Sequence, residues 1–164
     1  MVFGPKKRRV ALLCLGLVVA GILWSAIAIL GHKNQKEQVA VCSQGNCFET
    51  KIADDPQKRA AGLMFQKSLG ENQGMIFVFP AERVSSFWMK NMQISLDLVW
   101  LDKEKRITYL KKNVPPCPQE GPCPLLVPSG DALYVLELRA GVIDGLKIKE
   151  GDKFDFGREL TAKE

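Results

Sequence analysis

Histidine is almost absent from this chain of 164 residues, because the single example, His32, lies in a polar stretch after the first hydrophobic run. Catalytic triads and Cys–His pairs rely on histidine to take up a proton, so the rest of the chain lacks their usual base. A Gly-x-Ser-x-Gly elbow, a phosphate-binding loop and a dinucleotide fingerprint are also missing. The sequence therefore favours a binding domain over an enzyme, and we expect no cofactor.

Charged residues are missing from Val10 through Gly31, directly after the basic run Lys6-Lys7-Arg8-Arg9. As a helix, residues 10–30 would span about 31 Å, the thickness of a bilayer core. The pattern predicts a cytoplasmic tail at 1–9, a transmembrane anchor at 10–30, a linker at 31–38 and an exported domain at 39–164. We expect a single-pass inner-membrane protein with its domain on the periplasmic side. A cleaved signal peptide is the alternative, since Ala26-Ile27-Ala28 has the small-x-small form.

The excess of positive charge is concentrated in the N-terminal tail. The chain has 23 basic and 18 acidic residues, a net charge of +5, and four of the bases precede residue 31. The remaining 19 basic and 18 acidic residues give the predicted exported part a net charge of +1. Binding of nucleic acid requires clustered positive charge, so we expect no nucleic-acid partner.

Four cysteines follow the hydrophobic run, and their spacing favours two local disulfides. A two-residue turn at Gln44-Gly45 would place Cys42 opposite Cys47, within the Cα separation that a disulfide tolerates. Cys117 and Cys123 frame a proline-containing loop that one bridge can close. Four cysteines allow three pairings, and the two local ones are favoured. A zinc site is the alternative, although these spacings and an oxidising compartment disfavour it.

The fold class predicted for the exported domain is mainly β (α+β), a small antiparallel barrel-like sheet with one short helix. Runs rich in β-branched and aromatic residues predict strands at 39–42, 47–52, 75–79, 84–91, 94–101, 106–111, 132–139 and 153–156. Asp54-Asp55-Pro56 is typical of a helix start, and this helix is expected to continue to Gln66. A helical turn is expected at 141–146. The prolines in residues 114–128 predict a long loop there.

Two carboxylates occupy strand faces that are otherwise largely apolar. Asp97 shares a face of strand 94–101 with large aliphatic residues, and Glu137 does so on strand 132–139. Burying a charge is costly unless it is paired, so both residues predict either a binding site or structural ion pairs. The cations available as partners are Arg59, Lys90 and Arg139.

The segment from Phe87 to Asp97 combines an indole, thioethers, an ammonium, an amide and a carboxylate, a mixture typical of a binding-site wall. We expect it to bind a small polar or sugar-like ligand, or a peptide of a partner protein. The predicted ligand-binding residues are Arg59, Met64, Trp88, Met89, Asn91, Asp97 and Glu137.

Two other functions remain open. Asp97 and Glu137 could form the carboxylate pair of a hydrolase, because distances across strands are not visible in a sequence. Alternatively, the thioethers of Met64, Met75, Met89 and Met92 could bind Cu(I), although methionine is also an ordinary filler of irregular cores. We expect no other metal site.

Several motifs occur together in one order: Arg59-x-x-Gly-Leu-Met, Gly74-Met-x-Phe-x-Phe, Trp88-Met-Lys-Asn, Leu96-Asp97 and Tyr134-Val-Leu-Glu-Leu. In this order they closely resemble the uncharacterised conserved family called domain of unknown function 192. The resemblance covers residues 48–156 and implies a compact, mainly β domain, often exported, with no established activity, cofactor or substrate.

The recurrent positions of that family correspond to the seven predicted ligand-binding residues. This chain departs from the family pattern in two places. Met92 stands where the family tends to have threonine, which puts in doubt any role for a hydroxyl there. Ser95 stands where it tends to have proline, which loosens the entry into the strand.

Overall fold

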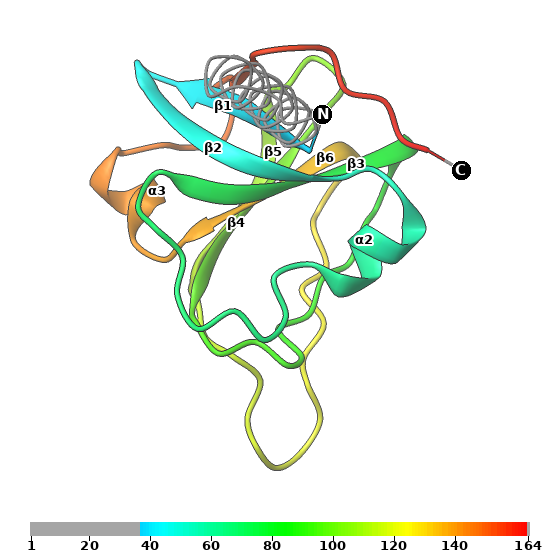
Figure 1. Cartoon of the computed structure of the whole chain (residues 1–164), viewed down its shortest axis with the longest axis vertical. Helices are drawn as coiled ribbons and strands as arrows, with labels where there is room; N and C mark the ends of the chain where they lie inside the picture. Colours follow the sequence, from blue (N-terminus) through cyan, green and yellow to red (C-terminus); the bar gives the residue numbers. More distant parts are fainter. Residues whose placement is uncertain (1–36, 164) are drawn as a thin grey trace, which may run out of the picture. The chain divides into compact units, whose positions relative to one another are not determined.

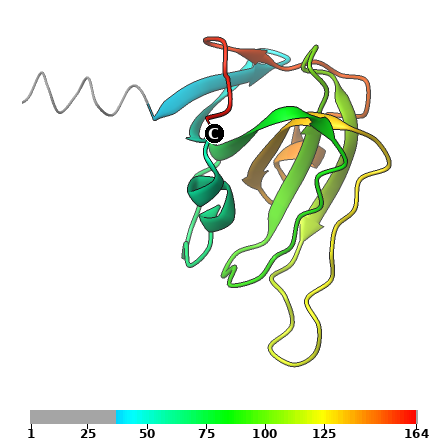
Figure 2. The same ribbon diagram turned by 90° about the vertical axis from the view of Figure 1, so that its right-hand side faces the viewer.

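A curled sheet of seven strands forms the centre of the unit that begins at Gln38, as the computed structural model shows (Figures 1 and 2). The model describes residues 37–163. The strands lie in the order β5-β4-β6-β3-β2-β1-β7. Their bounds are β1 Gln38–Ser43, β2 Asn46–Ala53, β3 Gln73–Arg83, β4 Leu96–Leu101, β5 Ile107–Val114, β6 Ala132–Arg139 and β7 Asp155–Phe156. Two short helices accompany them, α2 at Pro56–Ala61 and α3 at Val142–Gly145. The predicted mainly β class is confirmed.

The prediction of a purely antiparallel sheet is wrong for one pair of strands. β2 and β3 run parallel, with Thr50 opposite Gly74 and Ile52 opposite Ile76. A parallel pair needs a crossover connection, and residues 54–72, which contain α2, supply it. This crossover places α2 next to the sheet, where the candidate site is found.

The N-terminal hairpin has the predicted register. Cys42 lies opposite Cys47 and Ser43 opposite Asn46, across the turn at Gln44-Gly45. The structure contains both local disulfides, Cys42–Cys47 and Cys117–Cys123. The first ties β1 to β2, and the second closes the proline-containing loop.

Helix α2 begins as predicted and ends earlier. The Asp55 carboxylate caps the helix by accepting the backbone N–H of Lys58 at 2.7 Å, and Pro56 occupies the first turn. Gly62 ends it by adopting a φ of 48°. The left-handed region favours glycine, so the helix stops at Ala61 instead of continuing to Gln66.

The strand predicted at 84–91 is not formed. Only Phe87 makes a β-bridge, with Leu126, and Asn91 has a left-handed φ of 58° within a turn. The alternation of side chains is nevertheless present: Phe87 and Met89 face the core while Trp88 and Lys90 are exposed. The alternation in the sequence correctly predicted which side chains are buried. The segment forms no strand, because no neighbouring strand among residues 37–163 supplies a ladder of hydrogen bonds.

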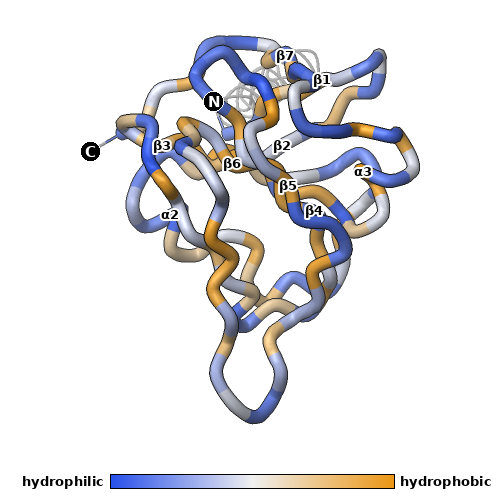
Figure 3. The backbone as a smooth tube through the Cα atoms, turned by 180° about the vertical axis from the view of Figure 1, so that it is seen from behind, coloured by the Kyte–Doolittle hydropathy of each residue, from blue (hydrophilic) through white to orange (hydrophobic). Residues whose placement is uncertain are grey.

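Each face of the sheet carries its own hydrophobic core, and the interior strand β6 is largely hydrophobic in Figure 3. One core includes Val99, Leu136 and Ile143 and lies on the side of α3. The other includes Phe77, Trp100 and Met89 and lies on the side of the 84–92 segment. A side chain on β4 or β6 therefore belongs to one of two separate environments.

None of the helices in residues 37–163 is long and apolar enough to cross a bilayer. The tail at 1–9, the anchor at 10–30 and most of the linker at 31–38, which the sequence predicts, lie outside the described residues.

Candidate functional site

Asp97 and Glu137 lie on opposite faces of the sheet, although their strands are neighbours. In the β4–β6 register Asp97 is opposite Leu138, and Leu98 is opposite Glu137. Directly opposed residues of antiparallel strands share a face, so the two carboxylates point away from each other. The expectation that both would line one pocket is therefore wrong. The hypothesis of a hydrolase that uses this pair is also wrong, because its two carboxyl groups would have to lie on the same face of the sheet.

Both oxygens of the Asp97 carboxylate accept hydrogen bonds from the backbone. It is completely buried, with 0% exposure, and accepts the N–H of Asn113 at 2.7 Å and the N–H of Ile143 at 2.9 Å. These bonds join β4 to the end of β5 and to the start of α3. Asp97 is thus a structural residue in this fold, and the reason is that both its oxygens already have partners.

Glu137 has the opposite surroundings. Its side chain is 5% exposed, and its Oε2 has no hydrogen-bond partner among the described residues. Burial raises the pKa of this carboxyl to about 8, so it is mostly protonated at neutral pH. Its strand neighbours, Met75 on β3 and Leu98 on β4, carry no charge. A protonated acid without a partner is a strong candidate for contact with a ligand.

Glu137 forms the floor of a small pocket between α2 and the 84–92 segment. The inner cavity measures about 40 Å³ and is lined by Glu137, Gly62, Leu63, Met64, Met92 and Lys90, together with four residues that also line an outer cavity. The outer cavity measures about 240 Å³ and adds Phe79, Ser86 and Leu125. The shared residues, Arg59, Phe77, Phe87 and Trp88, make the two cavities one site.

A close approach of two strands lies directly behind Glu137. A Cβ atom on Gly74 of β3 would come within 2.6 Å of the backbone oxygen of Glu137. Only glycine leaves room for this approach, so Gly74 holds β3 against β6 at the floor of the pocket.

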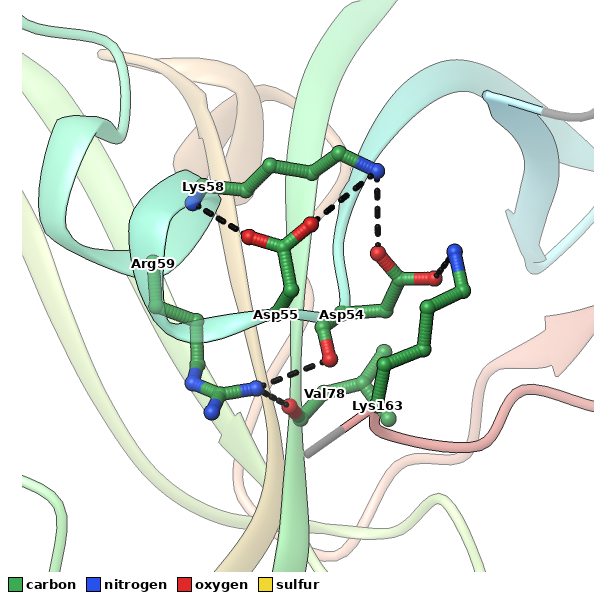
Figure 4. A network of polar contacts seen from close by, with 6 residues as sticks. All are labelled: Asp54, Asp55, Lys58, Arg59, Val78 and Lys163. Carbon is green, nitrogen blue, oxygen red and sulfur yellow. Dashed lines mark hydrogen bonds and ion pairs between the residues drawn. The ribbon is translucent and has the colours of Figure 1, made fainter.

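Arg59 anchors α2 to the sheet. Its Nη1 donates to the carbonyl oxygen of Asp54 at 3.0 Å and to that of Val78 at 2.9 Å (Figure 4). Its guanidinium also lies 5.7 Å from the centre of the Phe79 ring. Neither carbonyl carries a net charge, so the positive charge of Arg59 stays available along the wall of both cavities.

Trp88 and Lys90 stand at the mouth of the pocket. Trp88 is 49% exposed, and the Lys90 ammonium lies 5.6 Å from the centre of its ring. The backbone bridge between Phe87 and Leu126 places Leu125 beside this segment. The mouth therefore combines an aromatic surface with a cation.

Of the four methionines considered as Cu(I) ligands, two face the pocket. Met64 and Met92 line it, whereas Met75 and Met89 belong to the core below. The side-chain amide of Asn91 donates to the sulfur of Met64 at 3.7 Å, so Asn91 supports the wall. Met89 supports it as well, since its carbonyl oxygen accepts the N–H of Cys117 at 3.2 Å.

Sequence reasoning identified four residues that line the pocket, Arg59, Met64, Trp88 and Glu137, and missed several others. Phe77 and Gly62 belong to motifs that the sequence displays, so their order along the chain was a usable signal. Leu125 had no such signal, because it comes from the proline-containing loop. Arg139, a predicted partner of Glu137, instead bonds Glu71 at 2.8 Å and lines a separate cavity of about 490 Å³.

Comparison with known proteins agrees with this fold. A UPF0127 protein of Thermococcus sibiricus is 34% identical over 108 residues, which cover 65% of this chain and 64% of the relative. A UPF0127 protein of Pyrococcus furiosus is 31% identical over 118 residues, or 69% of this chain and 90% of the relative. The crystal structure of a protein of unknown function from Novosphingobium aromaticivorans is 32% identical with a TM-score of 0.64, covering 72% of this chain and 83% of that one.

The model of the DUF192 family, described as uncharacterized ACR, COG1430, matches residues 39–156. This match covers more than half of the chain. It starts at Val39, earlier than the predicted Phe48, so the Cys42–Cys47 hairpin lies inside it. The chain belongs to the uncharacterised conserved family DUF192, to which its similarity with the UPF0127 proteins also points.

Proposed function

We propose that this protein is a membrane-anchored, exported domain that binds a small organic ligand in the pocket above Glu137. The observation that carries the proposal is the buried Oε2 of Glu137, which has no partner in the described chain and faces a pocket. Support for the membrane anchor comes from the uncharged run at residues 10–30 and the basic tail before it. The two disulfides are typical of an exported protein.

An unpartnered buried carboxyl is expensive, which argues for a role besides folding. Leaving such a polar group without a hydrogen bond costs about 1–3 kcal/mol. Asp97 demonstrates that this sheet can satisfy a buried carboxylate with backbone N–H groups. A ligand with a hydrogen-bonding group would satisfy Glu137 in the same way, and its binding would recover part of that cost.

The side chains that line the pocket indicate which kind of ligand fits it. Phe77, Phe79, Phe87 and Trp88 favour an apolar or flat body, and Glu137 favours a head group that hydrogen-bonds. The two cavities are smaller than the roughly 300–1,000 Å³ of pockets for drug-sized molecules. We therefore favour a small molecule, with a sugar bound through its apolar face or one side chain of a partner peptide as alternatives.

Binding is favoured over the two other functions. A glycosidase mechanism needs two carboxyl groups on either side of the bond that breaks, and Asp97 faces away from this pocket. A Cu(I) site has two thioethers available, Met64 and Met92, beside the cations Arg59 and Lys90, which repel a metal ion.

The test is a ligand screen on the compact unit that begins at Gln38. Small aromatic acids, alcohols and amines, sugars, short peptides and Cu(I) are added while the midpoint of thermal unfolding is measured. One class is expected to raise the midpoint, and the rise is expected to be smaller in Glu137→Gln and Trp88→Ala. Lys111→Gln is the control, because Lys111 lies over Tyr109 outside the pocket. If stabilisation is unchanged in Glu137→Gln, the pocket is not the binding site.

A further inference from the structure

The cations around the pocket specify the ligand further, provided that the proposed function holds. We propose that the ligand is an anion, a small carboxylic acid with an aromatic or flat apolar body. Its carboxylate is attracted by Arg59 and Lys90, and its body lies against Phe77, Phe87 and Trp88.

The first support is the absence of compensating acids. Arg59 and Lys90 make no salt bridge with a carboxylate among residues 37–163, whereas Lys58, Lys105, Lys112 and Arg139 each do. Arg59 donates to two neutral carbonyl groups, and its guanidinium lies over an aromatic ring. Within residues 37–163, the charged group of Lys90 lies over the Trp88 ring and forms no ion pair. Two positive charges therefore border the pocket without a negative partner.

The second support is the state of Glu137, the one acid in the lining. Burial raises its pKa to about 8, so it is mostly neutral at pH 7 and does not cancel the positive charge. A ligand ammonium would be repelled by Arg59 and Lys90, and it would gain an ion pair only by forcing Glu137 to ionise. A ligand anion avoids both costs.

The position of the cations fits a single small molecule. Arg59 lines both the inner and the outer cavity, so one ligand can lie on the aromatic side chains and still be close to the guanidinium. Arginine presents several N–H donors in a plane that suits a carboxylate. The protonated Glu137 can donate its proton to an oxygen of the same ligand.

A matched series of three probes tests the charge: benzoate, benzyl alcohol and benzylamine. Each consists of one aromatic ring with a small head group that is negative, neutral or positive. Binding to the full chain is followed at pH 7 by intrinsic tryptophan fluorescence and by calorimetry. We expect benzoate to bind about tenfold more tightly than benzyl alcohol, and benzylamine to bind most weakly.

The variants locate the effect. Lys90→Gln is expected to weaken benzoate severalfold more than benzyl alcohol, while Lys111→Gln leaves both unchanged. The charged groups that line the pocket with Glu137 are Arg59 from α2 and Lys90 from the 84–92 segment. Ionisation of Glu137 lowers the positive charge, so benzoate affinity is expected to fall between about pH 7 and about pH 9, and to stay flat in Glu137→Gln.

The outcomes separate the two proposals. Tightest binding of benzylamine or benzyl alcohol, lost in Glu137→Gln, overturns the anion inference and leaves the binding function standing. Equal loss of all three probes in Lys90→Gln also overturns it, because the lysine would then act without regard to charge. If none of the three binds at millimolar concentration, the anion inference falls, and the ligand screen described above decides the proposed function.

Discussion

The two faces of the sheet each bury one acidic side chain, and they treat it differently. On the face of α3, Asp97 receives two backbone N–H groups and connects three elements. On the face of α2, Glu137 has an oxygen without a partner and lies under a pocket. Because the two residues lie on adjacent strands at neighbouring register positions, depth in the fold does not explain the difference. What differs is whether the covering segment supplies hydrogen-bond donors.

This comparison separates a residue that stabilises the fold from one that we propose binds a ligand. The segments that cover Asp97, the end of β5 and the start of α3, turn their N–H groups toward it. The segments that cover Glu137 present thioether, aliphatic and aromatic side chains together with Arg59 and Lys90, and none of these side chains donates a hydrogen bond to its Oε2. The following experiments test how far this distinction holds, beginning with the largest expected effect.

The largest effect is expected at Asp97. Asp97→Asn removes the negative charge that two backbone donors share, and places an amide N–H₂ against at least one of them. Hydrogen bonds to a charged group are worth about 1.5–3 kcal/mol each, so we expect a loss of roughly 3–5 kcal/mol in unfolding free energy. Urea unfolding measures it. Asp155→Asn, an exposed change on β7, is the control and is expected to stay within about 0.5 kcal/mol.

Glu137 is expected to make the stability of the protein depend on pH, because in the described chain its carboxyl lacks the hydrogen bonds that Asp97 has. Its pKa is about 8 in the folded protein and near 4.5 in the unfolded chain, so the folded state holds the proton longer. Stability is therefore present at low pH and is lost as pH rises from about 4.5 to about 8, by up to about 1.4 kcal/mol per pH unit. Unfolding measured between these values is expected to show the slope, and Glu137→Gln to lack it. A wild-type curve that rises across this window would contradict the unpartnered state.

A smaller effect is expected when Glu137 is replaced by an apolar residue of similar length. Glu137→Met removes the unpartnered Oε2 while filling the same space, so stability at neutral pH is expected to rise by about 1–2 kcal/mol. Thermal and urea unfolding measure the gain, and the probe that binds the wild type should no longer bind. A loss of stability would show that the carboxyl contributes to folding, as Asp97 does.

The sequence predicted the two carboxylates individually and could not predict their relation. Alternation along each strand correctly marked Asp97 and Glu137 as residues on apolar faces. Whether they share a face depends on how β4 and β6 are paired, and a shift of one residue would have brought them together. That register is set by contacts between strands far apart in the chain, which no local pattern reveals.

The same limit explains the other differences between prediction and fold. In residues 84–91 buried and exposed side chains alternate as they do in a strand. A strand also needs hydrogen bonds from a neighbouring segment, and in the described chain this segment has one such bridge, between Phe87 and Leu126. The helix start was predicted because its cap is local, as Asp55 and Pro56 show. Gly62, which ends the helix, was visible in the sequence, although the apolar spacing beyond it favoured a longer helix.

The smallest effect is expected at a third buried carboxylate, Asp54, which differs from both others by having cations as partners. Lys58 and Lys163 form ion pairs with it (Figure 4). Burial raises the pKa of Asp54, but the hydrogen bonds from the two lysines outweigh this and lower it overall. Lys163→Ala is expected to cost less than about 1 kcal/mol, because Lys163 is exposed to water and Lys58 remains.

A double-mutant cycle of Lys163→Ala with Asp54→Asn, followed by urea unfolding, measures the coupling of this pair directly. The expected order of cost is backbone-bonded Asp97 first, then Asp54 with its exposed lysines, and a gain at Glu137. If the coupling energy between Lys163 and Asp54 equals the loss of unfolding free energy in Asp97→Asn, the difference between backbone N–H groups and lysines as partners does not set the cost. The order expected here instead follows from rigidity: the two backbone N–H groups are fixed by β5 and α3, whereas a lysine must lose side-chain entropy to pair.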